Sequence, residues 1–232
     1  MEKISDYFPA LSFLGDSISV TKKIQLLEEL DIEDIEILNA SYSFLEQKAL
    51  NNSKEFDCID GTIYKILLES GNSDIVKKLN IHFADGLVDS HSKFYISYLE
   101  LQDLLLKNNF QEADRLTSQL LCLFVNIKNR SWLYFSDVKR IPQSELKILD
   151  NLWKTYSKGK FGFSVQRQIW LGNNQDWNLL WDKIGWRQKE VLCRYPEEFT
   201  WDLTAPIGHL PLSNQLRGIQ TLKALFNLKI WN

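Results

Sequence analysis

The sequence contains few of the residues that bind metals or carry redox chemistry. Its 232 residues include three histidines, three cysteines and one methionine, Met1, which excludes methionine ligation of a haem. The histidines and cysteines are scattered along the chain: His82, His91, His209, Cys58, Cys122 and Cys193. No two histidines have metal-ligand spacing and no CxxC pair occurs, so we expect no metal site. An odd number of distant cysteines favours structural thiols in a reducing compartment.

Other absences argue against further classes of protein. No apolar run approaches the roughly 18 residues that cross a membrane, although peripheral membrane contact stays open. Neither a phosphate-binding loop nor a GxGxxG fingerprint occurs. Without a Lys/Arg stripe or an RNA-binding motif, we expect no nucleic-acid partner. The first residues, MEKISDYFPALSF, contain acids and no arginine, so we expect neither a signal peptide nor a transit peptide.

Charge is divided unevenly along the chain, although the net charge is only −3. Residues 1–90 carry eight lysines, no arginine and 17 acidic residues, for a net charge of −9, whereas residues 91–232 have a net charge of +6. Every arginine and every tryptophan follows residue 114. Such different compositions predict two domains. We place an acidic helical bundle at 1–80, a linker at 81–91 and a second domain at 92–232.

Apolar residues recur at helical spacing in most segments, which predicts an all-α fold. We expect helix ends at four glycines and helix starts at three serines: Gly71, Gly159, Gly172 and Gly185, and Ser73, Ser144 and Ser164. Residues 186–211 show no clear period. Loops of that length are uncommon in compact domains and are often functional.

An aspartate, a histidine and a serine lie close together in WDLTAPIGHLPLSNQLRG (201–218): Asp202, His209 and Ser213. A hydrolase needs such groups hydrogen-bonded in series, but no GxSxG elbow accompanies them. Ser213 also stands where a helix N-cap is wanted. We therefore expect no catalytic residue here, with His209 a structural loop residue and Asp202 a local hydrogen-bond acceptor.

Four blocks after about residue 97 carry a family resemblance: WLYFSDV (132–138), FGFSVQRQIWL (161–171), WDKIGW (181–186) and FTWDLTAPIGHLPLSNQLRG (199–218). In this order and spacing they resemble the core of the genomes-uncoupled-four (GUN4-like) family of tetrapyrrole-binding regulators of chlorophyll synthesis. The resemblance covers the whole second domain. The acidic first domain is similar only in character to the N-terminal bundle of cyanobacterial and algal members.

The resemblance implies a helical core shaped like a cupped hand, whose apolar palm holds protoporphyrin IX or its magnesium complex. It implies a monomer that is not an enzyme and has no catalytic cofactor. Such a protein stimulates magnesium chelatase together with the large porphyrin-binding subunit of that enzyme, and some members bind bilins. With no transit peptide expected, a plastid-encoded protein of the chloroplast stroma fits best; a cyanobacterial cytoplasm is the alternative.

Residue by residue, the resemblance places Phe135 and Val138 in the palm and Phe199 in a mobile lid loop over the ligand. It places Asn214 and Arg217 at the palm edge, where Arg217 meets a propionate. Without the resemblance, Phe135 and Val138 read as core residues and Arg217 as a surface cation of a helix.

Three positions depart from the family pattern. Gln220 stands for a second arginine, Ser118 for an arginine on the second core helix, and Tyr195 for a tryptophan before Pro196. Tyr195 is kept among the ligand-binding candidates. Because losing a charge-assisted contact costs roughly 1.5–3 kcal/mol, we expect weaker porphyrin binding or a shifted ligand preference. A protein-interaction adaptor that has lost its ligand is the alternative.

Overall fold

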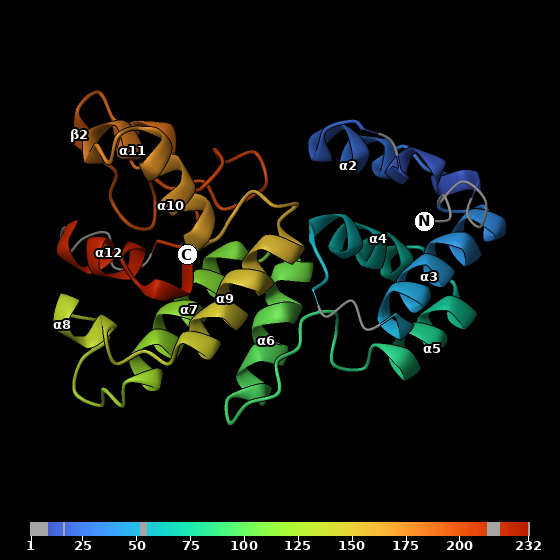
Figure 1. Cartoon of the computed structure of the whole chain (residues 1–232), viewed down its shortest axis with the longest axis horizontal. Coiled ribbons are helices and arrows are strands. Elements are labelled where there is room, and N and C mark those ends of the chain that lie inside the picture. Colours follow the sequence, from blue (N-terminus) through green and yellow to red (C-terminus); the bar gives the residue numbers. More distant parts are fainter. Residues whose placement is uncertain (1–8, 16, 52–54, 213–218, 232) are drawn as a thin grey trace. The chain divides into compact units, whose positions relative to one another are not determined.

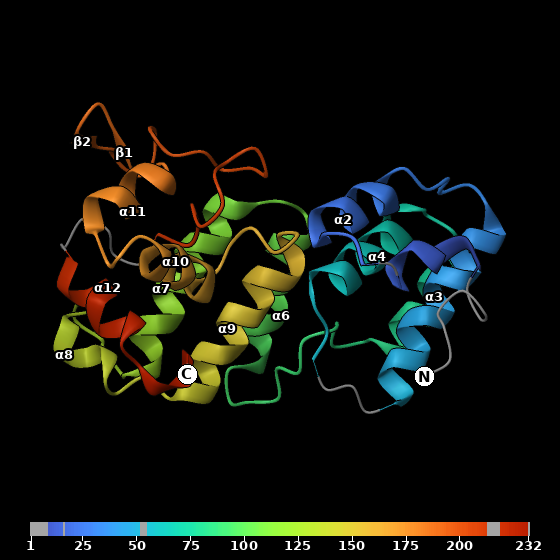
Figure 2. The same ribbon diagram turned by 45° about the horizontal axis from the view of Figure 1, so that its top comes forward.

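The protein is described here by a computed structural model that covers residues 9–15, 17–51, 55–212 and 219–231. The chain divides into two compact units, Met1–Asp89 and Ser90–Asn232. Figures 1 and 2 show that both consist of helices joined by loops, so the all-α prediction is confirmed. Among the described helices, none is both long enough and apolar enough to cross a membrane.

The first unit is built from short helices: η1 (Pro9–Gly15), α2 (Val20–Glu28), α3 (Ile35–Leu50), α4 (Cys58–Glu69) and α5 (Ser73–His82). α3 packs against α4 and α5, and α2 packs against α4. Leu27, Leu45, Ile63, Leu67 and Leu79 are fully buried and form the core of the unit. Burial of one apolar face per helix is what holds such short helices in place.

Each of the four α-helices described in this unit follows a polar residue that caps it. Ser19 caps α2 by accepting the backbone N–H of Lys22. Asp34 caps α3, Asp57 caps α4 and Asn72 caps α5, each accepting backbone N–H groups of the first turn. The predicted cap Ser73 was therefore wrong by one residue, because the longer amide of Asn72 reaches the free N–H groups. Gly71 does follow the end of α4, with a φ of +64° that favours glycine.

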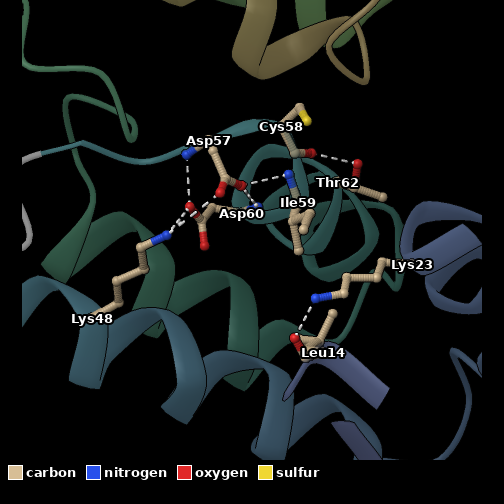
Figure 3. Close-up of polar contacts among 8 residues, drawn as sticks. All are labelled: Leu14, Lys23, Lys48, Asp57, Cys58, Ile59, Asp60 and Thr62. Carbon is tan, nitrogen blue, oxygen red and sulfur yellow. Dashed lines mark hydrogen bonds and ion pairs between the residues drawn. The ribbon is translucent and has the colours of Figure 1, made fainter. Parts of the chain in front are cut away.

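A buried ion pair joins α3 to α4 in the first unit (Figure 3). The ammonium of Lys48 lies 2.5 Å from Oδ2 of Asp60, whose side chain is almost fully buried. The same oxygen accepts the backbone N–H of Asp57 at 2.7 Å and completes a capping box. Burial raises the pKa of Asp60, opposed by the bond to Lys48. Lys48 is thus the only described cation paired with this carboxylate.

The second unit contains the remaining elements: α6 (Tyr95–Leu106), α7 (Phe110–Phe124), α8 (Phe135–Val138), α9 (Gln143–Tyr156), α10 (Phe163–Gly172), α11 (Trp177–Lys183), β1 (Arg187–Gln188), β2 (Val191–Leu192), α12 (Ile219–Phe226) and η3 (Lys229–Trp231). α6, α7 and α9 pack together, α10 packs on α11 and α12, and α12 packs on α8. β1 and β2 form an antiparallel hairpin.

Aromatic side chains fill the core of the second unit. Phe110, Trp153 and Phe161 are fully buried and pack on one another, with Phe110 and Phe161 edge to face at 5.4 Å. The indole N–H of Trp153 donates to Thr117 at 3.0 Å, as a buried indole requires.

Two predicted helix starts in this unit were wrong. Pro142, not Ser144, precedes the first turn of α9. α10 begins at Phe163, after Gly162, rather than at Ser164. The backbone N–H of Ser164 donates to Oδ1 of the buried Asp150 at 2.8 Å. A carboxylate from another helix thus caps α10, which local sequence cannot reveal.

Replacing Lys48 by Met should destabilise the first unit by about 3 kcal/mol, because it leaves the buried Asp60 carboxylate unpaired. Adding Asp60→Asn should recover most of that loss, since the amide oxygen still accepts the N–H of Asp57. Urea unfolding measures both. Lys107→Met, which breaks an exposed ion pair with Asp103, serves as the control and should cost below about 0.5 kcal/mol. An equal loss of stability in Lys48→Met and Lys107→Met would contradict the assignment of Lys48 as the partner of the buried Asp60 carboxylate.

Candidate functional site: a neutral recess on helix α7

Helix α7 forms the floor of the candidate site. One face of this amphipathic helix is buried in the second unit. Two positions on it, one helical turn apart, face different neighbours: Asp114 contacts the loop that ends at Leu212, and Ser118 borders a recess. Helices α8 and α12 lie beside this part of α7 in both views (Figures 1 and 2).

The recess lies between α7, the segment before α8, and α12, and has a volume of about 50 Å³. It is bordered by nine uncharged residues: Ser118, Leu121, Cys122, Ser131, Trp132, Leu133, Thr221, Leu222 and Leu225. Five are large and apolar, and four carry a hydroxyl or a thiol. An apolar wall with a few polar groups is typical of sites for organic ligands, but such sites usually occupy roughly 300–1,000 Å³. The recess can therefore take only a small part of a ligand's edge.

The small polar groups of the recess remain available at its surface. Thr221 donates only a long hydrogen bond, 3.4 Å, to the carbonyl oxygen of Leu133. Burial raises the pKa of Cys122, so its thiol is neutral and unreactive at neutral pH. Because none of the nine lining residues is charged, the recess suits an uncharged edge of a ligand.

Helix α8 stands at the rim of the recess and is held by a charged contact. Oδ2 of Asp137 accepts the backbone N–H of Tyr134 at 2.8 Å and pairs with Arg130 at 2.5 Å. The guanidinium of Arg130 also lies over the ring of Tyr134, 4.5 Å from its centre. Burial opposes ionisation of Asp137, but the Arg130 and Tyr134 hydrogen bonds prevail and lower its pKa.

The two predicted palm residues on α8 differ in their surroundings. Phe135 is 58% exposed, and its neighbour Tyr134 is 55% exposed. Val138 is fully buried and belongs to the core. An exposed phenylalanine on a short, pinned helix can pack against a flat ligand, whereas the side chain of Val138 supports the helix from below.

The two predicted residues of the loop lie next to each other. The Tyr195 and Phe199 rings are 6.5 Å apart. Phe199 is buried and packs against Trp186 and His209. Its side chain therefore belongs to the interior of the second unit. Tyr195 remains 39% exposed and presents the aromatic surface of this loop.

His209 and Asp202 have the structural roles expected of them. The Nδ1 atom of His209 lies 2.6 Å from the carbonyl oxygen of Ile184, and Nε2 accepts the backbone N–H of Thr200. Both ring nitrogens are therefore occupied by backbone groups. Burial lowers the pKa of His209, while Asp202 accepts the N–H and hydroxyl of Thr204. The two do not contact each other, and Ser213 lies outside the described residues.

The predicted residues that the structure describes thus form two groups. Phe135 and Val138 belong to α8, and Tyr195 and Phe199 belong to the loop. Asn214 and Arg217 lie outside the described residues. The recess itself was not predicted. The one feature of the sequence that could have indicated it was Ser118, a small residue where the family pattern has an arginine. In the residues that the structure describes, no cluster suited to a metal ion occurs.

The model of the GUN4-like family matches residues 91–229, nearly the whole of the second unit described above. The chain belongs to the GUN4-like family. A GUN4 structure from Chlamydomonas reinhardtii superposes with a TM-score of 0.54 at 34% identity, covering 62% of this chain and 92% of that one. The ligand-free GUN4 structure of Arabidopsis thaliana gives 0.53 at 35% identity, covering 62% and 98%.

Relatives of the whole chain extend the family beyond its helical core. The ycf53 protein of Porphyra purpurea is 44% identical over 92% of this chain and 91% of its own length. The chloroplastic tetrapyrrole-binding protein of Arabidopsis thaliana is 39% identical over 55% and 52%. The GUN4-like core is thus shared with the plant protein, and the red algal relative matches most of the first unit as well.

Replacing Asp137 by Asn should destabilise the second unit by about 2 kcal/mol at pH 7, because a charge-assisted bond is lost. A carboxyl group whose pKa is lowered on folding stabilises above its unfolded pKa, and this contribution disappears as pH falls. The difference between the variant and the wild type should therefore shrink as pH falls below about 4, and it disappears only below the lowered pKa of Asp137. Thermal unfolding between pH 3 and 7 measures this, and a constant difference at all pH values would contradict it.

Proposed function

We propose that the chain binds a tetrapyrrole on the α7 face of its second unit and regulates magnesium chelatase without being an enzyme. The observation that carries the proposal is the neutral, largely apolar recess beside exposed aromatic side chains, in a domain of the GUN4-like family. The name of the Arabidopsis relative, a tetrapyrrole-binding protein, supports the ligand class. Protoporphyrin IX and its magnesium complex are the ligands we propose, with a bilin as the alternative.

The recess and its rim suggest where each part of such a ligand would lie. A porphyrin is a flat apolar disk with carboxylates along one edge, and burial of apolar area gains about 25 cal/mol per Å². A small part of the uncharged edge fits the recess, and the ring plane can pack against Phe135 and Tyr195. The carboxylates must stay outside the recess, where we propose that Asn214 and Arg217 bind them. Phe199 then supports the loop from within rather than covering the ligand.

The remaining assignments follow from the family and its hosts. We propose the large porphyrin-binding subunit of magnesium chelatase as partner and a monomeric state. Relatives come from red algae, a cyanobacterium and a plant chloroplast. We therefore propose the chloroplast stroma as the location, with a cyanobacterial cytoplasm as the alternative. The first unit, with its linker at 81–91, is proposed as a separate docking module.

Titrating protoporphyrin IX into the purified chain should give a saturable red shift of the Soret band and quenching of tryptophan fluorescence. Arg217→Ala should weaken binding by about tenfold or more, because a charge-assisted carboxylate contact is lost. Unchanged affinity would remove Arg217 from the site. If the wild type shows no saturable change at tens of micromolar, the chain is an adaptor that has lost its ligand, as Gln220 and Ser118 would suggest.

Filling the recess tests whether the ligand enters it. Ser118→Leu adds apolar volume at the floor and should weaken porphyrin binding about tenfold, since that loss corresponds to nearly two buried methylene groups. The control is Leu123→Ala, which changes a 52% exposed leucine of α7 that does not border the recess. Thermal unfolding checks that both variants are folded. Equal affinity in all three proteins would place the ligand elsewhere.

A further inference from the structure

Asp114 carries a buried carboxylate that takes no part in the proposed ligand site. It lies on the inner face of α7, and its residue is 97% buried. Its Oδ1 accepts the backbone N–H of Leu212 at 2.7 Å, across 98 positions of sequence. The bond ties the end of the loop that carries Tyr195 to the helix that forms the floor of the recess.

The electrostatic surroundings of Asp114 contain no described counter-ion. The phenol of Tyr195 faces it from the loop, and Glu112 and Arg115 flank it on α7 itself, where they pair with each other at 2.5 Å. Among the described side chains of α6 and α9, the helices packed on α7, no charged group interacts with Asp114. Among the described residues, an ionised Asp114 is therefore a buried charge whose one partner is a backbone N–H, which is a costly arrangement.

We propose that Asp114 is a positioning residue that holds the loop ending at Leu212 against α7, and that tetrapyrrole affinity therefore depends on whether this carboxyl is charged. When neutral, it packs at low cost and the loop stays seated beside the recess. When ionised, it gains by reaching water, which requires the chain at Leu212 to move off α7. This inference rests on the proposed function, because it concerns the affinity of that site.

The sign and the range of the effect follow from burial. Burial raises the pKa of Asp114 to about 7, opposed by the hydrogen bond from Leu212. A carboxyl group whose pKa is raised on folding favours the folded arrangement at low pH, and that advantage is lost as pH rises toward the folded value. The seated loop therefore loses stability relative to the released loop as pH rises from about 4, where an exposed aspartate ionises, to about 7, and loses no more above that. Ligand carboxylates titrate near pH 4 to 5 and stay ionised throughout.

A second tether of the same loop provides a comparison that does not titrate. The amide of Gln166, on α10, donates to the carbonyl oxygens of Gly208 and Pro211 at 3.0 and 2.7 Å. Gln166 and Asp114 therefore hold neighbouring parts of one segment, but only Asp114 can change its charge. If Asp114 had a purely structural role, replacing it and replacing Gln166 should change the pH dependence of ligand affinity in the same way.

The test measures the dissociation constant of protoporphyrin IX by tryptophan quenching between pH 6 and pH 8.5, in the full chain. The wild type should lose about tenfold in affinity over this range, which corresponds to ligand binding raising the pKa of Asp114 by about one unit. Asp114→Asn keeps the acceptor oxygen and removes the charge. It should match the wild type at pH 6 and stay flat to pH 8.5.

The matched control is Gln166→Met, which removes the second tether. It should weaken binding at every pH and keep the wild-type slope. A flat wild-type profile, or an Asp114→Asn variant that keeps the wild-type slope, would overturn the proposal. Absence of saturable binding in the wild type at any pH would instead overturn the proposed function. If Asp114→Asn is unstable, amide exchange at Leu212 in the wild type decides: between pH 5 and pH 7 it should accelerate beyond the general base-catalysed increase.

Discussion

The second unit depends on satisfying the backbone polar groups of a long segment that forms little regular structure. Between α11 and α12, residues 186–212 contain one hairpin of two two-residue strands and are otherwise turns and irregular structure. Buried N–H and C=O groups without partners cost roughly 1–3 kcal/mol each. The side chains that supply partners come from several elements: Asp114 on α7, Gln166 on α10, and Trp186 and His209 within the segment. Helix packing and loop structure are therefore set by the same contacts.

This constraint also explains the polar residues that look catalytic in sequence. His209 binds the backbone on both sides of its ring, and Trp186 donates its indole N–H to the carbonyl oxygen of His209 at 2.7 Å. Gly208 approaches Ile169 and Ile184 so closely that a side chain there would collide with both. Residues 208–212 of the loop are buried like core residues, whereas most residues from 187 to 207 are exposed. The exposed Tyr195 packs there against Phe199 and Trp201.

The two units use buried charge in different ways. In the first, Lys48 compensates Asp60 directly, so the pair joins two helices whatever the pH near neutrality. In the second, Asp114 has a backbone N–H as its partner and no described cation. A compensated carboxylate is a structural joint, whereas an uncompensated one with a pKa near 7 is sensitive to its surroundings. Asp114 is the residue that joins the loop to the helix of the candidate site.

The sequence by itself determined the helical class, the compositional division of the chain, the structural roles of His209 and Asp202, and the family, because periodicity, charge and local motifs are properties of neighbouring residues. Helix starts were missed where the cap comes from elsewhere, as with Asp150 and α10. Only the tertiary structure decided that Phe135 is exposed while Val138 and Phe199 are buried. It alone brought Ser118 beside Thr221 and Asp114 beside Leu212, because those contacts join segments about a hundred residues apart.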